Sequence, residues 1–521
     1  MGTQHLEIER KFDVGPEFVV PDLCSVPGVA TVGEPEEIDL SATYHDTPGL
    51  RLLRSRVTLR RRTGGTDAGW HVKLPAGVGA RTELHQPLGR ATKKPPAAVL
   101  APVRGIVGTS EVGPVATVHT HRVLRRLFDA TGRQLAEVAD DLVTGTALPA
   151  EAGEAATVSS WREIEVELVD GGPEVLDAVA EALTAAGARP SASSSKVGQV
   201  LRTRQTPDGE PAAATVADAS STSGKSAAGG RTAGEVVLSA VAAQVGALRQ
   251  ADLAVRTGGA EGVHDFRVAC RKLRSTLAVF RSVLDRDATD PIRAELQWAG
   301  QELSAARDGE VALEHLRDLV ARQPVELVLG PVAARLQQTE LHDHLLGEDH
   351  VLEVLAGARY LRLVDTLDQL LVEPPVTSAA AGPARPVLRA GVRHSRKRLL
   401  HAVRTAERTP GPASHAALHE VRKAAKRVRY TGEVVEPVLG KRAKKLQREM
   451  KRVQTVLGHA QDTVITRECC RRLGLAAAAA GENPWTYGRL HALEEARAER
   501  QEARFWAHWP RTRKGLAAAA R

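Results

Sequence analysis

The chain has 521 residues and a formal net charge of +8, from 71 Lys and Arg against 63 Asp and Glu. This length suffices for two or more domains, each with its own hydrophobic core. The four cysteines are too sparse for a disulfide framework and lack the spacing of a zinc site, and no apolar stretch reaches the roughly 20 residues of a membrane span. Because no signal-peptide pattern is present either, these features predict a cytoplasmic protein with no membrane partner.

Composition divides the chain into three regions. Residues 1–202 are predicted to be rich in strands, and residues 232–515 to form helix after helix, in two repeats of about 232–384 and 385–515. Residues 203–231 consist mainly of Gly, Ala, Ser, Thr, Pro and Asp, which cannot bury enough apolar surface to order the chain, so we expect a flexible linker there. The sequence therefore predicts a multidomain α+β protein with an all-α C-terminal domain.

The first predicted strand, residues 5–12, sets the pattern of the N-terminal domain. Since side chains of a strand alternate between two faces, Glu7, Glu9 and Lys11 share one face, and the other is mostly apolar. Later predicted strands repeat this alternation, with charged faces that carry Arg60 and Arg62, His71 and Lys73, Arg81 and Glu83, Glu137 and Asp141, and Glu163, Glu165 and Glu167. One such strand alone is typical of a solvated edge. The repetition favours an antiparallel β-barrel with a charged interior tunnel and helices that cover its apolar outside.

These strands resemble those of CYTH domains, the triphosphate tunnel metalloenzymes. The resemblance rests on Glu7-Ile8-Glu9-Arg10-Lys11, which is similar to the ExExK signature, and on the ordered series of charged strands that ends at Ser195-Lys196. It covers about residues 4–202. It implies a metal-dependent triphosphatase that acts inside the barrel.

A triphosphate carries about four negative charges, so its binding needs several cations in fixed positions. The phosphate-binding residues are expected to be Arg60, Arg62, Lys73, Arg81, Arg122 and Lys196, with Lys196 at one end of the tunnel. Carboxylates beside such an anion repel it unless a metal ion intervenes, and oxygen ligands suit Mg²⁺ or Mn²⁺. The expected metal ligands are Glu7, Glu9, Asp141, Glu163, Glu165 and Glu167, and the residues expected to carry the catalysis are Glu7, Glu9, Lys11 and Glu165. The alternative is a barrel whose interior charges only pair with one another, which requires many imperfect buried ion pairs.

The helical region contains an internal repeat with a basic face. At helical spacings that share one face, the first copy has His264, Arg267, Arg271 and Arg274, and the second has His419, Arg422, Lys426 and Arg429. We call these the first and second basic stripes. One such helix is typical of an ordinary solvated face, whereas two copies without acids favour a shared anion-binding surface. Residues 385–452, with 20 Lys and Arg against 5 Asp and Glu, add to this surface.

This region resembles the CHAD domain, a helical module named for its conserved histidines and associated with binding inorganic polyphosphate. The resemblance spans about residues 233–513 and implies polyphosphate binding by the two stripes and by Lys423. The two histidines lack acidic or cysteine partners at ligand spacing, which favours phosphate binding or helix packing over metal ligation.

Three functions remain open at this point. The first is a metal-dependent triphosphatase, acting on inorganic triphosphate or a related triphosphate, whose helical domain captures polyphosphate. The second is a non-catalytic polyphosphate-binding protein that localises to polyphosphate granules, and the third is an adenylate-cyclase-like tunnel enzyme. Nucleic acid is disfavoured as a partner, because aromatic residues make up only 3% of the chain and no helix-turn-helix or RNA-binding signature is present.

Overall fold

The computed structural model describes residues 3–76, 80–89, 93–150, 154–202 and 231–519, without the side chains of some residues, chiefly 304–311 and 342–348. The chain divides into two compact units, Met1–Ser223 and Gly224–Arg521. The linker predicted for residues 203–231 lies, apart from its last residue, outside the described residues.

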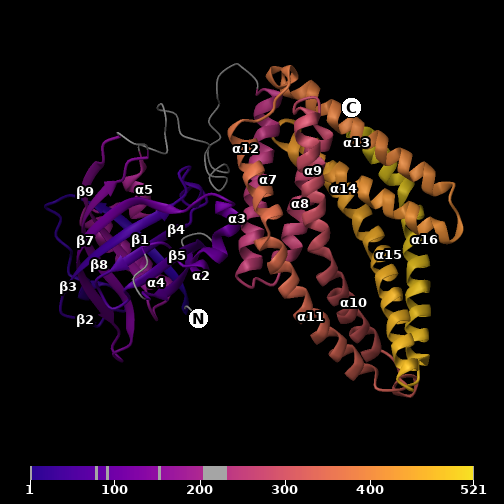
Figure 1. The fold of residues 1–521 in the computed structure, drawn as a ribbon, viewed down its shortest axis with the longest axis horizontal. Helices are drawn as coiled ribbons and strands as arrows, with labels where there is room; N and C mark the ends of the chain where they lie inside the picture. The colour runs from indigo at the N-terminus through magenta and orange to yellow at the C-terminus, as the bar shows by residue number, and fades with distance from the viewer. Residues whose placement is uncertain (1–2, 77–79, 90–92, 151–153, 203–230, 520–521) are drawn as a thin grey trace. The chain divides into compact units, whose positions relative to one another are not determined.

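The N-terminal unit is built on one antiparallel sheet that closes on itself (Figure 1). Its strands are β1 (Thr3–Val14), β2 (Thr31–Val32), β3 (Glu36–Asp46), β4 (Thr58–Thr63), β5 (Gly69–Pro75), β6 (Ala80–Pro87), β7 (Gly113–Phe128), β8 (Gln134–Ala147), β9 (Thr157–Leu168) and β10 (Arg189–Pro190). Neighbouring strands follow the order β1-β6-β5-β4-β3-β7-β8-β9, and β9 pairs back onto β1. Within the described residues, these eight strands form a closed barrel, as the sequence predicts.

Strand β1 closes the barrel because it pairs with a different strand at each end. Its first half pairs with β6, which sets Glu7 opposite Arg81, and its second half pairs with β9, which sets Lys11 opposite Glu165. The charged faces of β1, β6 and β9 therefore meet around the seam. A barrel closed in this way leaves no unpaired edge among its eight strands.

Helix α4 (Pro173–Ala185) covers part of the outer face of the barrel. Its side chains Val179 and Leu183 are fully buried in one core with Ile164 and Val166 of β9. These two β9 residues alternate with Glu163, Glu165 and Glu167, so their burial under a helix directs the three carboxylates to the interior. The expectation that a helix covers the apolar outside of the barrel is thus confirmed.

Helix α5 (Lys196–Val200) packs into one end of the barrel. Val197, Val200 and Leu201 form an apolar core with residues that include Val118 of β7 and Val143 of β8. Val118 shares its face with Arg122, and Val143 shares its face with Asp141, so both point inward. That end of the interior is therefore apolar and filled by α5, and the charged residues occupy the rest.

The C-terminal unit is helical throughout its described length (Figure 1). Its long helices are α7 (Ala233–Arg256), α8 (Gly262–Val279), α9 (Arg286–Glu302), α10 (Ser304–Ala321), α11 (Val332–Ala356), α12 (Ala358–Val372), α13 (Ala384–Glu407), α14 (Ser414–Leu439), α15 (Lys441–Ala479) and α16 (Trp485–Ala519). No helix within the described ranges combines the length and the apolar character that crossing a membrane requires.

The two repeats share one core in which the apolar backs of α8 and α14 are buried. Phe266 and Leu273 of α8, and Val421 and Val428 of α14, are fully buried in this core. A second, smaller core joins α10 and α11 to the later turns of α15 and to α16. The burial of one face leaves the basic stripe of each helix on the opposite side.

Candidate functional site

Lys196 lies at the centre of the acidic cluster in the barrel. Its ammonium group donates to Glu163 at 2.7 Å and to Glu165 at 2.7 Å, and pairs with Asp141 at 2.9 Å. Burial disfavours the charged lysine, but the three carboxylates outweigh this and hold the pKa of Lys196 well above its usual value. Lys196 was expected at one end of the tunnel, and the structure buries it among three predicted metal ligands.

Arg122 adds a second cation to the same three-acid cluster. Its guanidinium donates two hydrogen bonds to Asp141, each 2.7 Å long, and a third of 2.7 Å to Glu165. Burial opposes ionisation of Asp141, whose side chain is fully buried, but Lys196 and Arg122 hold its pKa below the usual value. The acids of this cluster are therefore already paired with protein cations.

Lys11 links this cluster to the opening strand. It forms ion pairs with Glu165 and, at 3.1 Å, with Glu9. Glu167 stands opposite Glu9 across the β1–β9 pairing, and its pKa is raised by burial and by the nearby charges of Glu9 and Glu165, against the pull of Lys73. Glu9 and Glu167 thus form an acidic edge beside the three-acid cluster.

Glu7 belongs to a second group of charges, on β1, β5 and β6. Lys73 pairs with Glu7 at 2.6 Å and with Glu83 at 4.0 Å. Burial and a hydrogen bond to Glu83 raise the pKa of Glu7 to about 8, although Lys73 opposes this. Glu83 also accepts from His71 at 2.7 Å. Two carboxylates that share a proton in this way are a site at which a divalent cation would replace that proton.

The predicted phosphate-binding arginines are divided between the interior and the rim. Arg60 lies 3.5 Å from Glu83, and its pKa is raised by Tyr44 and Glu83 in spite of burial. Burial and the neighbouring Arg60 lower the pKa of Arg62 to about 9. Arg81 instead donates to the backbone carbonyl of Ser194 at 2.8 Å, with its guanidinium exposed.

Sequence reasoning assigned no role to three residues that the structure places against the acids. Glu83 and His71 form the hydrogen bond described above, and the indole N–H of Trp161 donates to Glu163 at 2.6 Å. Alternation had already placed Glu83 and His71 on charged faces, so a signal for these two was present. Trp161 carries no charge and so gave no chemical signal, although alternation along β9 places it on the same face as Glu163 and Glu165.

In the helical unit, the two basic stripes face each other. Burial and four arginines, Arg422, Arg271, Arg267 and Arg429, lower the pKa of Lys426 to about 7. Since two of these arginines belong to α8 and two to α14, the stripes converge on one positively charged surface. This arrangement is the shared basic surface that the internal repeat predicts. It does not by itself identify the anion that binds there.

Three predicted residues lie apart from this convergence. His264 is exposed at the start of the first stripe, and Lys423 is exposed and paired with Glu420 at 2.6 Å. The ring nitrogen Nδ1 of His419 is 2.6 Å from the side-chain oxygen of Gln461 on α15. In the described part of the chain, the only group of three or more His, Cys, Asp and Glu side chains close enough together to share a metal ion is Asp141, Glu163 and Glu165.

Arg427 lies on α14 outside the second basic stripe. Its pKa is lowered to about 10 by burial and by Arg398, Arg293, Arg274 and Arg281, which come from other parts of the helical unit. A cluster of this kind cannot be found by periodicity along one helix, because its members share a surface only after α8, α9, α13 and α14 pack together.

Comparison with known proteins agrees with this geometry. The family model of the CYTH domain matches residues 5–197, and that of the CHAD domain matches residues 239–471. The uncharacterized proteins Rv2226 and MT2285 from two strains of Mycobacterium tuberculosis are each 36% identical over 508 residues, which covers 96% of this chain and 94% of theirs. The chain belongs to the CYTH-CHAD family.

Two solved structures are more distant from this CYTH-CHAD protein. PptA from Streptomyces chartreusis is 21% identical with a TM-score of 0.45, and the alignment covers 54% of this chain and 99% of PptA. The CHAD domain from the plant Ricinus communis is 25% identical with a TM-score of 0.43, covering 56% of this chain and 93% of that domain. At these TM-scores the two likenesses add nothing to the family match.

Proposed function

We propose that this CYTH-CHAD protein hydrolyses inorganic triphosphate, or a related triphosphate, inside its barrel with the help of Mg²⁺ or Mn²⁺, and that its helical domain binds inorganic polyphosphate. One observation carries the proposal. Lys11, Lys73, Lys196 and Arg122 lie inside one closed barrel with a group of carboxylates that a metal ion could bridge to phosphate.

The cations of the barrel are suited to hold a chain of phosphates. Arg122 presents a planar fork that matches phosphate oxygens, and Lys11 and Lys73 act as compact point charges. Each of them now contacts a carboxylate, so a triphosphate would exchange these ion pairs for contacts with its own oxygens. Arg60 pairs with Glu83, and Arg62 pairs with Asp67. Both arginines are expected to bind the same anion.

The carboxylates fit a hard divalent ion. Oxygen atoms of Asp141, Glu163 and Glu165 all lie within 4.8 Å of one another, and Glu9 and Glu167 stand next to them. Oxygen donors in this number are the ligands that Mg²⁺ and Mn²⁺ prefer. When bound, such an ion would neutralise charge on the phosphate oxygens and polarise the phosphoryl group towards water. Lys11 and Glu165, which touch each other, are the residues expected to orient the reacting groups.

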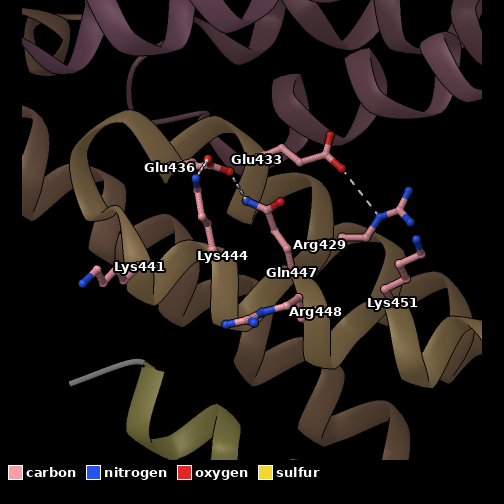
Figure 2. A pocket seen from close by; sticks show the side chains of 8 residues that line it. All are labelled: Arg429, Glu433, Glu436, Lys441, Lys444, Gln447, Arg448 and Lys451. Carbon is pink, nitrogen blue, oxygen red and sulfur yellow. Dashed lines mark hydrogen bonds and ion pairs between the residues drawn. The ribbon is translucent and has the colours of Figure 1, made fainter. Parts of the chain in front are cut away.

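Polyphosphate is the partner that best suits the converging stripes. Four arginines lie near Lys426, and burial together with these cations has the largest influence on its pKa. Arg429 of this group pairs with Glu433 at 3.6 Å (Figure 2), but the leading electrostatic influences on Lys426 are all cationic, and a polymer of phosphates supplies many negative charges at close spacing. Binding of this polymer would concentrate the protein at polyphosphate granules in the cytoplasm.

The proposal is tested by phosphate release from the full-length protein with inorganic triphosphate, thiamine triphosphate and ATP, each with Mg²⁺ and with Mn²⁺. We expect Glu165→Gln to lower turnover by at least 100-fold, because Glu165 contacts Lys11, Lys196 and Arg122. Glu181→Gln is the matched control, since Glu181 is exposed on the covering helix α4.

The outcomes separate the three functions. Equal turnover in wild type and Glu165→Gln would contradict the assignment of the barrel acids. Release of pyrophosphate with a cyclic product from ATP would instead identify a cyclase. Binding of triphosphate without turnover on any substrate would identify a non-catalytic protein.

Polyphosphate binding has its own test. Arg271→Gln combined with Lys426→Gln removes one cation from each stripe, and we expect at least a tenfold loss of affinity for long-chain polyphosphate in titration calorimetry. The matched control combines Arg500→Gln with Arg504→Gln, which removes two cations from exposed positions of α16. This control should leave the affinity for polyphosphate within about twofold. An equal loss in both double variants would show that net charge alone governs binding.

A further inference from the structure

Trp161 of β9 stands between the apolar end of the barrel and the three-acid cluster. The β8–β9 pairing sets it opposite Val143, and alternation places it on the inward face with Glu163. Its ring packs against the apolar core that α5 forms with β7 and β8. Its indole N–H donates to Oε2 of Glu163 at 2.6 Å. One side chain therefore links the core around α5 to an acid of the cluster.

Packing fixes the ring of Trp161 independently of this hydrogen bond. A Cβ atom on Gly145 of β8 would lie 3.3 Å from Cζ3 of Trp161 and 2.2 Å from Cγ2 of Val200. The missing side chain at Gly145 thus makes room for both the ring and α5. An indole nitrogen can only donate a hydrogen bond, and a ring held in this way gives that donor a set direction.

The two oxygens of Glu163 have donors of different kinds. Oε1 accepts from the ammonium of Lys196 at 2.7 Å, whereas Oε2 accepts from the neutral indole of Trp161. In Asp141 and Glu165, both carboxylate oxygens contact lysine or arginine cations. Glu163 therefore differs from the other two acids, because a neutral donor holds one of its oxygens.

This difference matters for a divalent ion. Protein cations on the carboxylate oxygens repel such an ion, since like charges at short distance oppose each other. The indole of Trp161 has no charge, so its hydrogen bond to Oε2 is compatible with a metal ion at Oε1. The terminal torsion of a glutamate side chain is broad, and this hydrogen bond restricts it. Contacts that orient a metal ligand typically change metal affinity by about 10–100-fold.

We propose that Trp161 is a positioning residue of the barrel site, whose N–H orients the carboxylate of Glu163 so that Oε1 faces Asp141 and Glu165 as a ligand for a divalent ion. This inference rests on the proposed metal-dependent function. It adds a neutral aromatic residue to a site whose other predicted members are all charged. Because the same ring belongs to the core around α5, the packing of that core determines the orientation of a metal ligand.

The test measures Mn²⁺ binding to the full-length protein without phosphate, from the electron paramagnetic resonance signal of free Mn²⁺. Trp161→Phe removes the N–H but keeps an aromatic ring, and we expect it to bind Mn²⁺ about tenfold more weakly. Trp161→Gln loses the ring but retains an N–H donor at the same number of bonds from Cβ. It should bind Mn²⁺ more tightly than Trp161→Phe and yet be less stable to urea, because it leaves a larger cavity.

Two controls separate positioning from packing. Trp70→Phe makes the same substitution at a barrel tryptophan that is 2% exposed and whose ring centroid lies 5.1 Å from that of His45. It should lower stability and leave the affinity for Mn²⁺ within about twofold. In a Glu163→Gln background, Trp161→Phe should change the affinity less than twofold, because the carboxylate through which Trp161 acts is absent.

The outcomes distinguish this inference from the proposed function. Wild-type affinity in Trp161→Phe overturns the positioning role and leaves the metal site intact. So does an undiminished effect of Trp161→Phe in the Glu163→Gln background, or weaker Mn²⁺ binding by Trp161→Gln than by Trp161→Phe, since either result indicates packing alone. Absence of Mn²⁺ binding by the wild-type protein would overturn the metal site itself, and the positioning role with it.

Discussion

At the scale of single residues, the barrel site is built from charges that satisfy one another. Asp141, Glu163 and Glu165 surround the ammonium of Lys196, and only 9% of Lys196 is exposed. Removing one partner of a buried ion pair is strongly destabilising, because the other partner remains charged without compensation. Lys196 therefore has a structural role that is measurable without any substrate.

Lys196→Met should lower the free energy of unfolding by about 3–5 kcal/mol, since it leaves three close carboxylates with fewer cations. Millimolar Mg²⁺ or Mn²⁺ should restore part of this loss, because the metal ion takes the position of the ammonium between the same oxygens. Denaturant unfolding with and without metal measures both effects. Arg189→Met, an exposed cation on β10, is the control. A loss of stability in Lys196→Met that metal ions do not reduce would contradict a metal site at these acids.

Lys426 shows the opposite balance, because cations and not acids surround it. Its pKa is lowered to about 7 in the folded protein, by burial and by four arginines, from a usual value of 10.5. The unfolded chain thus binds more protons than the folded protein between about pH 7 and pH 10.5, and stability should rise with pH across this window.

Lys426→Met should remove this pH-dependent gain and stabilise the protein at pH 6–7 by about 1–3 kcal/mol, because the burial of an unpaired ammonium is relieved. The same variant should bind polyphosphate at least threefold more weakly. Urea unfolding between pH 6 and pH 10 and titration calorimetry check the two effects. A variant that is both less stable at pH 6–7 and unchanged in affinity would show that Lys426 does not lie in an unbalanced basic site.

At the scale of elements, α5 determines where Lys196 lies. The helix packs against inward-facing residues of β7 and β8, and Gly145 of β8 lies directly under it. A Cβ atom on Gly145 would come within 2.2 Å of the Cγ2 atom of Val200. Position 145 therefore tolerates only glycine while α5 occupies this end of the barrel.

Gly145→Val should displace α5 and cost about 1–3 kcal/mol of stability through overpacking. Because Lys196 begins α5, the acid cluster should lose its ammonium in the same variant and bind divalent ions more tightly. Calorimetric titration with Mn²⁺ and exchange at residues 196–201 measure the two effects together. Gly113→Val, at an open position where no atom lies within 4 Å, is the control. Retained protection of α5 in Gly145→Val would disprove the coupling.

At the scale of the whole molecule, the chain combines a barrel whose charges are internally balanced with a helical unit whose basic surface is not. The barrel acids all have cationic neighbours, whereas Lys426 and Arg427 are each surrounded by arginines. We therefore expect the helical unit to dominate the binding of large polyanions.

Duplex DNA in excess should not displace long-chain polyphosphate from the full-length protein at moderate salt. The converging stripes gather cations of α8 and α14 around Lys426, which would favour an anion with closely spaced phosphates. Fluorescence anisotropy of labelled polyphosphate measures the competition. Displacement at equal charge concentration would identify a generic polyanion binder, whose affinity depends on salt and not on the spacing of phosphates.

Composition and periodicity predict the two-domain architecture and the orientation of the barrel charges. Glu7, Glu9 and Lys11 alternate with apolar residues, and a barrel with an apolar outer face under α4 can place them only inside. The same reasoning placed the two stripes opposite the apolar backs of α8 and α14, because a helix buries one face. Both inferences depend on local periodicity, which the order of residues in the sequence shows directly.

Which charges meet depends on how distant segments of the chain pack together. Alternation cannot show that Lys196 stands among Asp141, Glu163 and Glu165, because this depends on how α5 packs into the barrel. Nor can periodicity show that Lys426 faces arginines of the other repeat, or that Glu433 and Glu436 line a pocket with the start of α15 (Figure 2). Contacts between distant segments follow from packing of the whole core, so local sequence patterns do not predict them.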